Sequence, residues 1–139
     1  MSRTTAAPFG RATQIAAEWL RDVAKAYDTH DEQFAYRVLR AWLHTLRDRL
    51  TVTMAAHFAA QLPELWRGVY YDGWNPHTVP VSHDILGYIE DFADQAGISA
   101  GDVPKAAAIV RTVVASRTGS GVVTKALDQF PLELRDIFR

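Results

Sequence analysis

The sequence contains one short motif twice, and the spacing of the two copies constrains how the chain can be built. Gln61–Pro63 has the pattern Gln, apolar residue, Pro, followed by an apolar and basic tail, and Gln129–Pro131 repeats it. The two copies are offset by 68 residues (129 − 61). A repeat of this length indicates two similar supersecondary units. We expect each Pro to open the last helix of its unit and each Gln to bond to backbone at the turn.

Apolar residues recur at steps of three and four along most of the chain, which is the spacing of one helix face. Between residues 31 and 49 they are Phe34, Val38, Leu39, Trp42, Leu43 and Leu46. Residues 11–27 follow the same rule with Ile15, Trp19, Val23 and Tyr27. The periodicity therefore predicts an all-α fold of about eight helices.

Short polar side chains, prolines and glycines indicate where these helices begin and end. We expect helix caps at Asp31, Thr51, Ser82, Asp102 and Ser120, prolines in first turns at Pro63, Pro104 and Pro131, and a helix end at Gly97. Asp28-Thr29-His30 is predicted to be the exit turn of the first helix. Residues 71–81 contain Asp-Gly and Asn-Pro, which are turn signals, and are interpreted as a connector.

A second match extends the repeat toward the N-terminus. At an offset of 71 residues, Asp31, Val38, Arg40 and Trp42 align with Asp102, Ile109, Arg111 and Val113. We therefore divide the chain into a loose arm (1–10), a first pseudo-repeat (11–70), the connector (71–81) and a second pseudo-repeat (82–139). Two tandem four-helix units are predicted to pack through the second and sixth helices into one compact bundle. Two separate domains of about 70 residues are the alternative, which the small core of such a domain disfavours.

Composition excludes several classes of protein. The chain has 139 residues, a net charge of −1 and no cysteine, so disulfides, thiolate metal sites and a cysteine nucleophile are absent. No apolar run approaches the ~20 residues of a membrane span, and the N-terminus lacks the apolar core of a secretory signal. We find no phosphate-loop, dinucleotide or nucleophile motif. These features predict a soluble cytoplasmic protein without a cofactor and without a membrane partner.

A positively charged stripe is the first candidate site. Arg37, Arg40, His44 and Arg47 follow one another at steps of three and four, so they share one side of a helix. Such a stripe is typical of a surface that binds nucleic acid or another anionic ligand. A charged outer face is, however, the normal state of an amphipathic helix, so we prefer the interpretation that the stripe is solvated.

An aromatic cluster is the second candidate site, formed by Trp66, Tyr70, Tyr71 and Trp74. Trp and Tyr supply large, rigid contact area, so the cluster would suit the binding of a protein partner or a homodimer contact. The more common use of large aromatic residues is core packing, here as a wedge between the two helix sets.

The connector supplies a third hypothesis. Tyr71, Trp74, His77 and His83 fall within residues 71–83 and would line a small-molecule or metal site. No histidine pair has the spacing of a known zinc motif, so we assign no metal ligand. The leading hypothesis is a non-enzymatic helical protein-interaction module with an unidentified protein partner, and nucleic-acid binding and the connector site are its alternatives.

Residues 36–50 (Tyr-Arg-Val-Leu-Arg-Ala-Trp-Leu-His-Thr-Leu-Arg-Asp-Arg-Leu), 55–63 (Ala-Ala-His-Phe-Ala-Ala-Gln-Leu-Pro) and 68–74 (Gly-Val-Tyr-Tyr-Asp-Gly-Trp) carry a family resemblance. With the terminal Gln-Phe-Pro-Leu-Glu-Leu-Arg-Asp-Ile-Phe, the chain resembles a bacterial family known as domain of unknown function 2267. The resemblance covers most of the chain. It implies a small all-helical protein and supplies no activity.

Overall fold

The structure is a computed structural model that describes residues 7–81 and 84–137. Within these ranges the chain forms eight α-helices, one short 3₁₀ helix and no strand, so the all-α prediction is confirmed. The α-helices are α1 (Ala7–Ala26), α2 (Glu32–Asp48), α3 (Val52–Ala59), α4 (Glu64–Tyr71), α5 (Ile85–Ala96), α6 (Val103–Arg117), α7 (Val122–Leu127) and α8 (Leu132–Ile137); η1 (Ala100–Asp102) precedes α6.

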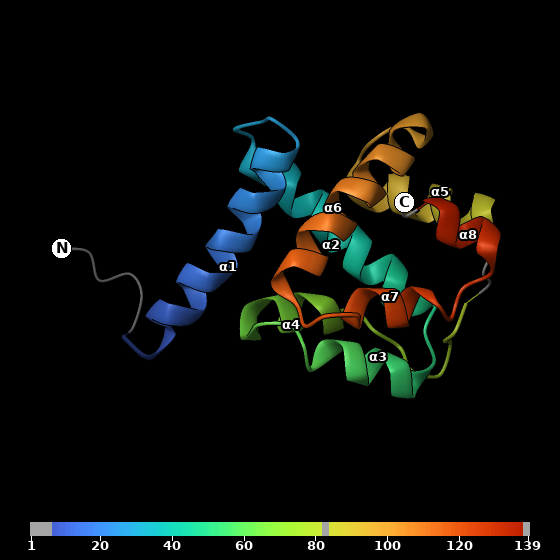
Figure 1. Ribbon diagram of the computed structural model, residues 1–139, viewed down its shortest axis with the longest axis horizontal. Coiled ribbons are helices and arrows are strands. Elements are labelled where there is room, and N and C mark those ends of the chain that lie inside the picture. The colour runs from blue at the N-terminus through green and yellow to red at the C-terminus, as the bar shows by residue number, and fades with distance from the viewer. Residues whose placement is uncertain (1–6, 82–83, 138–139) are drawn as a thin grey trace.

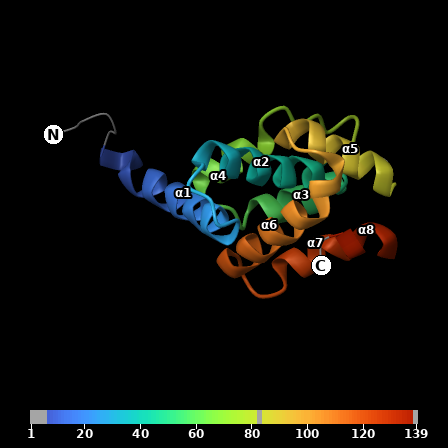
Figure 2. The same ribbon diagram turned by 90° about the horizontal axis from the view of Figure 1, so that it is seen from above.

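Helix α2 lies at the centre of the bundle, and the other helices cover it (Figures 1 and 2). Helices α1, α4, α5 and α6 all pack against α2. Helices α3 and α7 pack against each other on one side of the bundle, while the N-terminal end of α1 projects away from it. Every residue from Ala41 to Arg47 is buried, so the C-terminal half of α2 has no solvated face.

The two halves of the sequence interlock. Helix α1 packs on α6 and α5 packs on α2, and both contacts are more extensive than the predicted contact between α2 and α6. Buried residues of both halves belong to one continuous apolar cluster. The compact bundle is therefore confirmed. Its division into two four-helix repeats stays a prediction.

Several predicted helix ends are confirmed. Asp31 accepts a hydrogen bond from the Phe34 amide at 3.0 Å, and Thr51 accepts one from the Met54 amide at 3.2 Å. These side chains satisfy amides that have no partner inside the helix. Gly97 ends α5 with φ = 68°, in the left-handed region that glycine reaches without a Cβ clash.

Other predicted ends are wrong or shifted. Asp102 precedes α6 but accepts from the Ser99 hydroxyl instead of a helix amide, and Gly121, not Ser120, occupies the cap position of α7. Ser82 lies outside the described residues, and Asp84 caps α5 by accepting from the Gly87 amide. The predicted arm was too long, because α1 already begins at Ala7. No helix in the described ranges is both long and apolar enough to cross a membrane.

Candidate functional site

The predicted stripe on α2 is not a solvent-exposed surface. His44 is 3% exposed and Arg47 is 4% exposed, whereas Arg40 is half-buried and Arg37 is exposed. His44 and Arg47 are buried by tertiary packing, because α4 and α5 cover this side of α2. Both the exposed anion-binding surface and the solvated helix face that we preferred are therefore wrong for His44 and Arg47. Whether Arg37 or Arg40 binds an anion stays a prediction.

The buried members of the stripe bind the C-terminal end of α4. Arg47 Nη1 donates to the carbonyl oxygens of Tyr70 and Asp72, each at 2.8 Å. His44 Nε2 lies 2.6 Å from the carbonyl oxygen of Val69, which can only accept, so this ring nitrogen carries a hydrogen. The last carbonyls of a helix lack intrahelical partners and carry partial negative charge. Arg47 and His44, which belong to α2, therefore cap the C-terminal end of α4.

The outer members of the stripe act in a similar way. Arg37 Nε donates to the carbonyl oxygen of Ala96, the last residue of α5, at 3.0 Å. Arg40 forms a 3.4 Å ion pair with the carboxylate of Asp72, the residue that follows α4. The whole stripe thus contacts the C-terminal ends of α4 and α5, both of which pack against α2.

The position of His44 predicts a pH dependence of stability. Burial lowers the pKa of His44 below its ordinary value of 6.5, and Arg47 and Arg40 lower it further, against the opposing hydrogen bonds to Val69 and Gln95. The folded state therefore favours the neutral ring, so its contribution is complete above pH 6.5 and is lost as the pH falls.

We expect the free energy of unfolding to fall as the pH drops below about 6.5, by at most ~1.4 kcal/mol per pH unit from this group. His44→Gln should flatten that part of the slope in urea unfolding at several pH values. His30→Gln, at an exposed histidine, is the matched control. Equal slopes for the two variants would contradict the assignment.

The four aromatic residues do not form one surface. Trp66 is 3% exposed, and its indole Nε1 donates to the Ala16 carbonyl of α1 at 3.1 Å. Tyr70 is fully buried; burial raises the pKa of its hydroxyl, which donates to the Ala55 carbonyl at 2.9 Å. The prediction of an aromatic binding surface is therefore wrong for Trp66 and Tyr70. The expected wedge between halves is also wrong for Trp66, which joins α4 to α1.

The remaining two aromatics lie at the start of the connector. Tyr71 and Trp74 are half-buried, with ring centroids 5.3 Å apart. His77 is exposed, and His83 lies outside the described residues. In the described ranges no group of three or more His, Cys, Asp or Glu side chains is placed to hold a metal ion. A small-molecule site at the connector stays a prediction.

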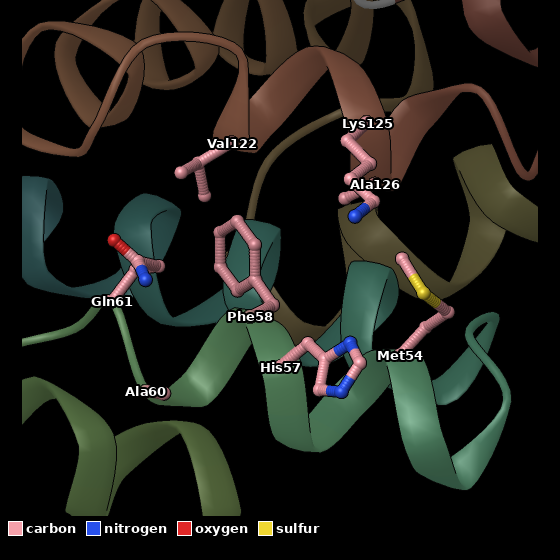
Figure 3. A pocket seen from close by; sticks show the side chains of 8 residues that line it. All are labelled: Met54, His57, Phe58, Ala60, Gln61, Val122, Lys125 and Ala126. Carbon is pink, nitrogen blue, oxygen red and sulfur yellow. The ribbon is translucent and has the colours of Figure 1, made fainter.

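A groove between α3 and α7 is the candidate site that the structure adds (Figure 3). Its volume is about 330 Å³, and it is lined by Met54, His57, Phe58, Ala60, Gln61, Val122, Lys125 and Ala126. Figure 3 shows the Phe58 ring rising from α3 between the helices, with Val122 and Lys125 extending from α7. Phe58 and Ala126 are buried and form an apolar floor, while His57, Gln61 and Lys125 are exposed at the rim.

Arg67 and Arg135, at corresponding positions of the two halves, bind carbonyls at the turns that follow α3 and α7. After α3, Arg67 donates to the carbonyls of Ala59 at 3.0 Å and Leu62 at 2.7 Å. After α7, Arg135 donates to the carbonyl of Phe130 at 3.0 Å. In both halves, the arginine in the tail of the repeated motif therefore donates to the carbonyls of the turn. The bond expected from glutamine is absent, since neither Gln61 nor Gln129 has a side-chain hydrogen bond among the described residues.

The electrostatics of the groove are unusual for this chain. No Asp, Glu, Lys or Arg occurs between Leu50 and Pro63, so the whole of α3 is uncharged. Lys125 is the one charged residue of α7, and it lies on the groove. The eight lining residues include no Ser, Thr, Cys, Asp or Glu, so they provide no hydroxyl or thiol nucleophile and no paired carboxylates. This arrangement is suited to binding an apolar group beside one negative charge.

The sequence carried a signal for this groove that we did not use. Met54 and Val122, His57 and Lys125, and Phe58 and Ala126 are three pairs of lining residues, each separated by the repeat offset of 68. The uncharged run from Leu50 to Pro63 is visible in the sequence as well. Neither pattern indicates that α3 and α7 meet, which is what makes them a site.

Comparison with known proteins supports the resemblance found in the sequence. No curated protein matches the chain. Residues 16–137, from the middle of α1 to the end of α8, match the model of a family described as "Uncharacterized conserved protein (DUF2267)". Because this match spans most of the chain, the protein belongs to the DUF2267 family.

Proposed function

We propose that the protein is a non-enzymatic helical interaction module and that it holds a protein partner in the groove between α3 and α7. The observation that carries the proposal is an uncharged helix beside an apolar groove, in a chain of which 22% is charged. Depletion of charge at the centre of a patch distinguishes protein interfaces from the rest of the surface.

The surroundings of the groove favour a protein over a small molecule. Val52 is 45% exposed on α3, Ala56 is exposed on the same helix, and Ala60, the residue after α3, is exposed as well. Small side chains such as Ala60, which lines the groove, allow the backbone of a partner to approach closely. A large apolar side chain of the partner would fill the groove, as anchor residues do at interface centres.

Charge complementarity defines the partner further. Lys125 is the single formal charge on the groove, with His57 and Gln61 as neighbouring hydrogen-bonding groups and no carboxylate among the lining residues. An acidic residue next to the apolar anchor would pair with Lys125. The partner is therefore an amphipathic segment with an acidic edge.

Nucleic-acid binding through the α2 stripe is the weaker alternative. It would require His44 and Arg47 to leave the carbonyl oxygens of α4 that they now bind. A buried carbonyl left without a donor costs about 1–3 kcal/mol. Only Arg37 and Arg40 would then reach a phosphate without such a loss.

Site-specific photo-crosslinking in cells that produce the protein tests the proposal. A photoreactive amino acid at Ala60, on the groove, should give a discrete product with another protein. The same amino acid at Leu86, which is 76% exposed on α5, is the matched control and should not. Lys125→Glu should weaken the Ala60 product several-fold by charge reversal, whereas Lys25→Glu, on the exposed end of α1, should leave it unchanged.

Three results would overturn the proposal. These are equal products from both positions, no product from Ala60, and a product consisting only of two copies of this chain. The last result would assign the groove to self-association.

A further inference from the structure

A second cavity, on the far side of α7 from the groove, contains an arginine to which the described residues offer no partner. The cavity has a volume of about 160 Å³. It is lined by Arg111 of α6, by Thr124 and Leu127 of α7, by Asp128, which follows α7, and by Arg135 of α8. Two guanidinium groups and one carboxylate therefore face the same space, which leaves one net positive charge.

Arg111 differs from the other buried and half-buried arginines. In the described part of the chain, each of the others donates to a carbonyl or carboxylate oxygen: Arg40, Arg47, Arg49, Arg67 and Arg135. In the described part of the chain, the Nε of Arg111 is inaccessible to solvent and has no hydrogen-bond partner, and no ion pair involves this side chain. A buried donor without an acceptor is costly, so such a group calls for a physical explanation.

Arg40, the residue of the first half that aligns with Arg111, does have a carboxylate partner. Arg40 and Arg111 align at the sequence offset of 71, and Arg40 is paired with the Asp72 carboxylate at 3.4 Å. Arg111 has no such acid among the described residues. The acid nearest in the cavity, Asp128, lies 3.5 Å from Arg135 Nη1 instead.

We propose that the cavity formed by Arg111, Thr124 and Arg135 binds a phosphoryl group, either inorganic phosphate or the phosphate of a small monoester. Arg111 offers the four N–H donors of Nη1 and Nη2, and the Thr124 hydroxyl makes no other hydrogen bond among the described residues. Arg135 is held in place through its bond to the Phe130 carbonyl, which leaves Nη2 as a further donor. Planar guanidinium groups match the oxygen atoms of phosphate with paired hydrogen bonds.

The size and polarity of the cavity agree with this ligand. A volume of about 160 Å³ suits a phosphate group and excludes a polymer from the interior of the cavity. A phosphoryl dianion has three or more acceptor oxygens, enough to serve both guanidiniums and the hydroxyl at once. A carboxylate has only two, and Asp128 already supplies one carboxylate to the cavity.

Isothermal titration calorimetry of the intact protein with inorganic phosphate tests the proposal, with sodium chloride at equal ionic strength as the reference. Wild type should bind phosphate saturably, and Arg111→Gln should weaken binding at least about tenfold. Arg40→Gln, at the aligned and already paired arginine, should bind like wild type. Asp128→Asn should bind more tightly, because it removes the one negative charge of the cavity.

Titrations with phenyl phosphate and with acetate distinguish the possible ligands. Tighter binding of phenyl phosphate than of inorganic phosphate would indicate a monoester, and equal or weaker binding would indicate the free ion. Acetate that binds as tightly as phosphate would overturn the phosphoryl assignment. So would the absence of saturable phosphate binding by wild type, or binding by Arg111→Gln equal to that of wild type. Circular dichroism and Arg111→Lys, which retains the charge and should bind better than Arg111→Gln, separate loss of the site from loss of the fold.

Discussion

Replacement of Arg47 by methionine should lower the free energy of unfolding by about 3 kcal/mol or more. Methionine keeps the length of the aliphatic stem but removes three hydrogen bonds, to the carbonyls of Tyr70 and Asp72 and to the carboxylate of Asp48 at 2.8 Å. The two carbonyls lie at the C-terminal end of α4, where no backbone amide replaces the lost donor. Urea unfolding followed by circular dichroism measures the change.

Arg37→Met is the matched control, since Arg37 belongs to the same sequence stripe but is exposed. It should cost about 1 kcal/mol, because it removes one hydrogen bond, to the Ala96 carbonyl, whereas Arg47→Met removes three. Equal losses for Arg37→Met and Arg47→Met would show that the stripe is not divided between an outer edge and a buried cap. Arg47→Lys should recover part of the loss, which provides a second variant if Arg47→Met does not fold.

Trp66→Ala is expected to produce the second large effect, a loss of about 3–5 kcal/mol in the free energy of unfolding. The side chain is 3% exposed, packs on the Tyr36 ring with centroids 5.7 Å apart, and donates to the Ala16 carbonyl. Its removal would leave a cavity where α4 meets α1. Differential scanning calorimetry should show a clearly lower Tm.

Trp74→Phe tests the other end of the predicted aromatic cluster. Trp74 is half-buried, and its indole Nε1 is inaccessible to solvent and has no hydrogen-bond partner in the described ranges. Phenylalanine removes that unpaired donor at a small loss of contact area, so we expect a change within about 1 kcal/mol. A loss as large as that of Trp66→Ala would contradict the division of the cluster into a packed part and a peripheral part.

Local rules explain why several helix ends could be predicted. Asp31 and Thr51 begin helices because their side chains accept from amides three residues ahead, and Gly97 ends one because it tolerates positive φ. The same rules gave wrong results at Asp102 and Ser120. There the Ser99 hydroxyl and the positive φ of Gly121 determine the local conformation instead.

The candidate sites were harder to predict, because each of them depends on which helices meet. The spacing of Arg37, Arg40, His44 and Arg47 correctly indicated one side of a helix. It did not indicate that α4 and α5 would cover that side. The groove was missed for the same reason: Met54 and Val122 face each other only because α3 packs on α7.

The sequence by itself determined the helical class, several helix ends and the residues that share a face, because these follow from hydrogen bonds and side-chain spacing within a few residues. Only the tertiary structure decided which faces are buried. An arginine on α2 has the same local sequence whether it faces water or the C-terminal carbonyls of another helix. That choice depends on packing between segments far apart in the chain. It makes Arg47 a cap for α4 and leaves Arg111 without a partner among residues 7–81 and 84–137.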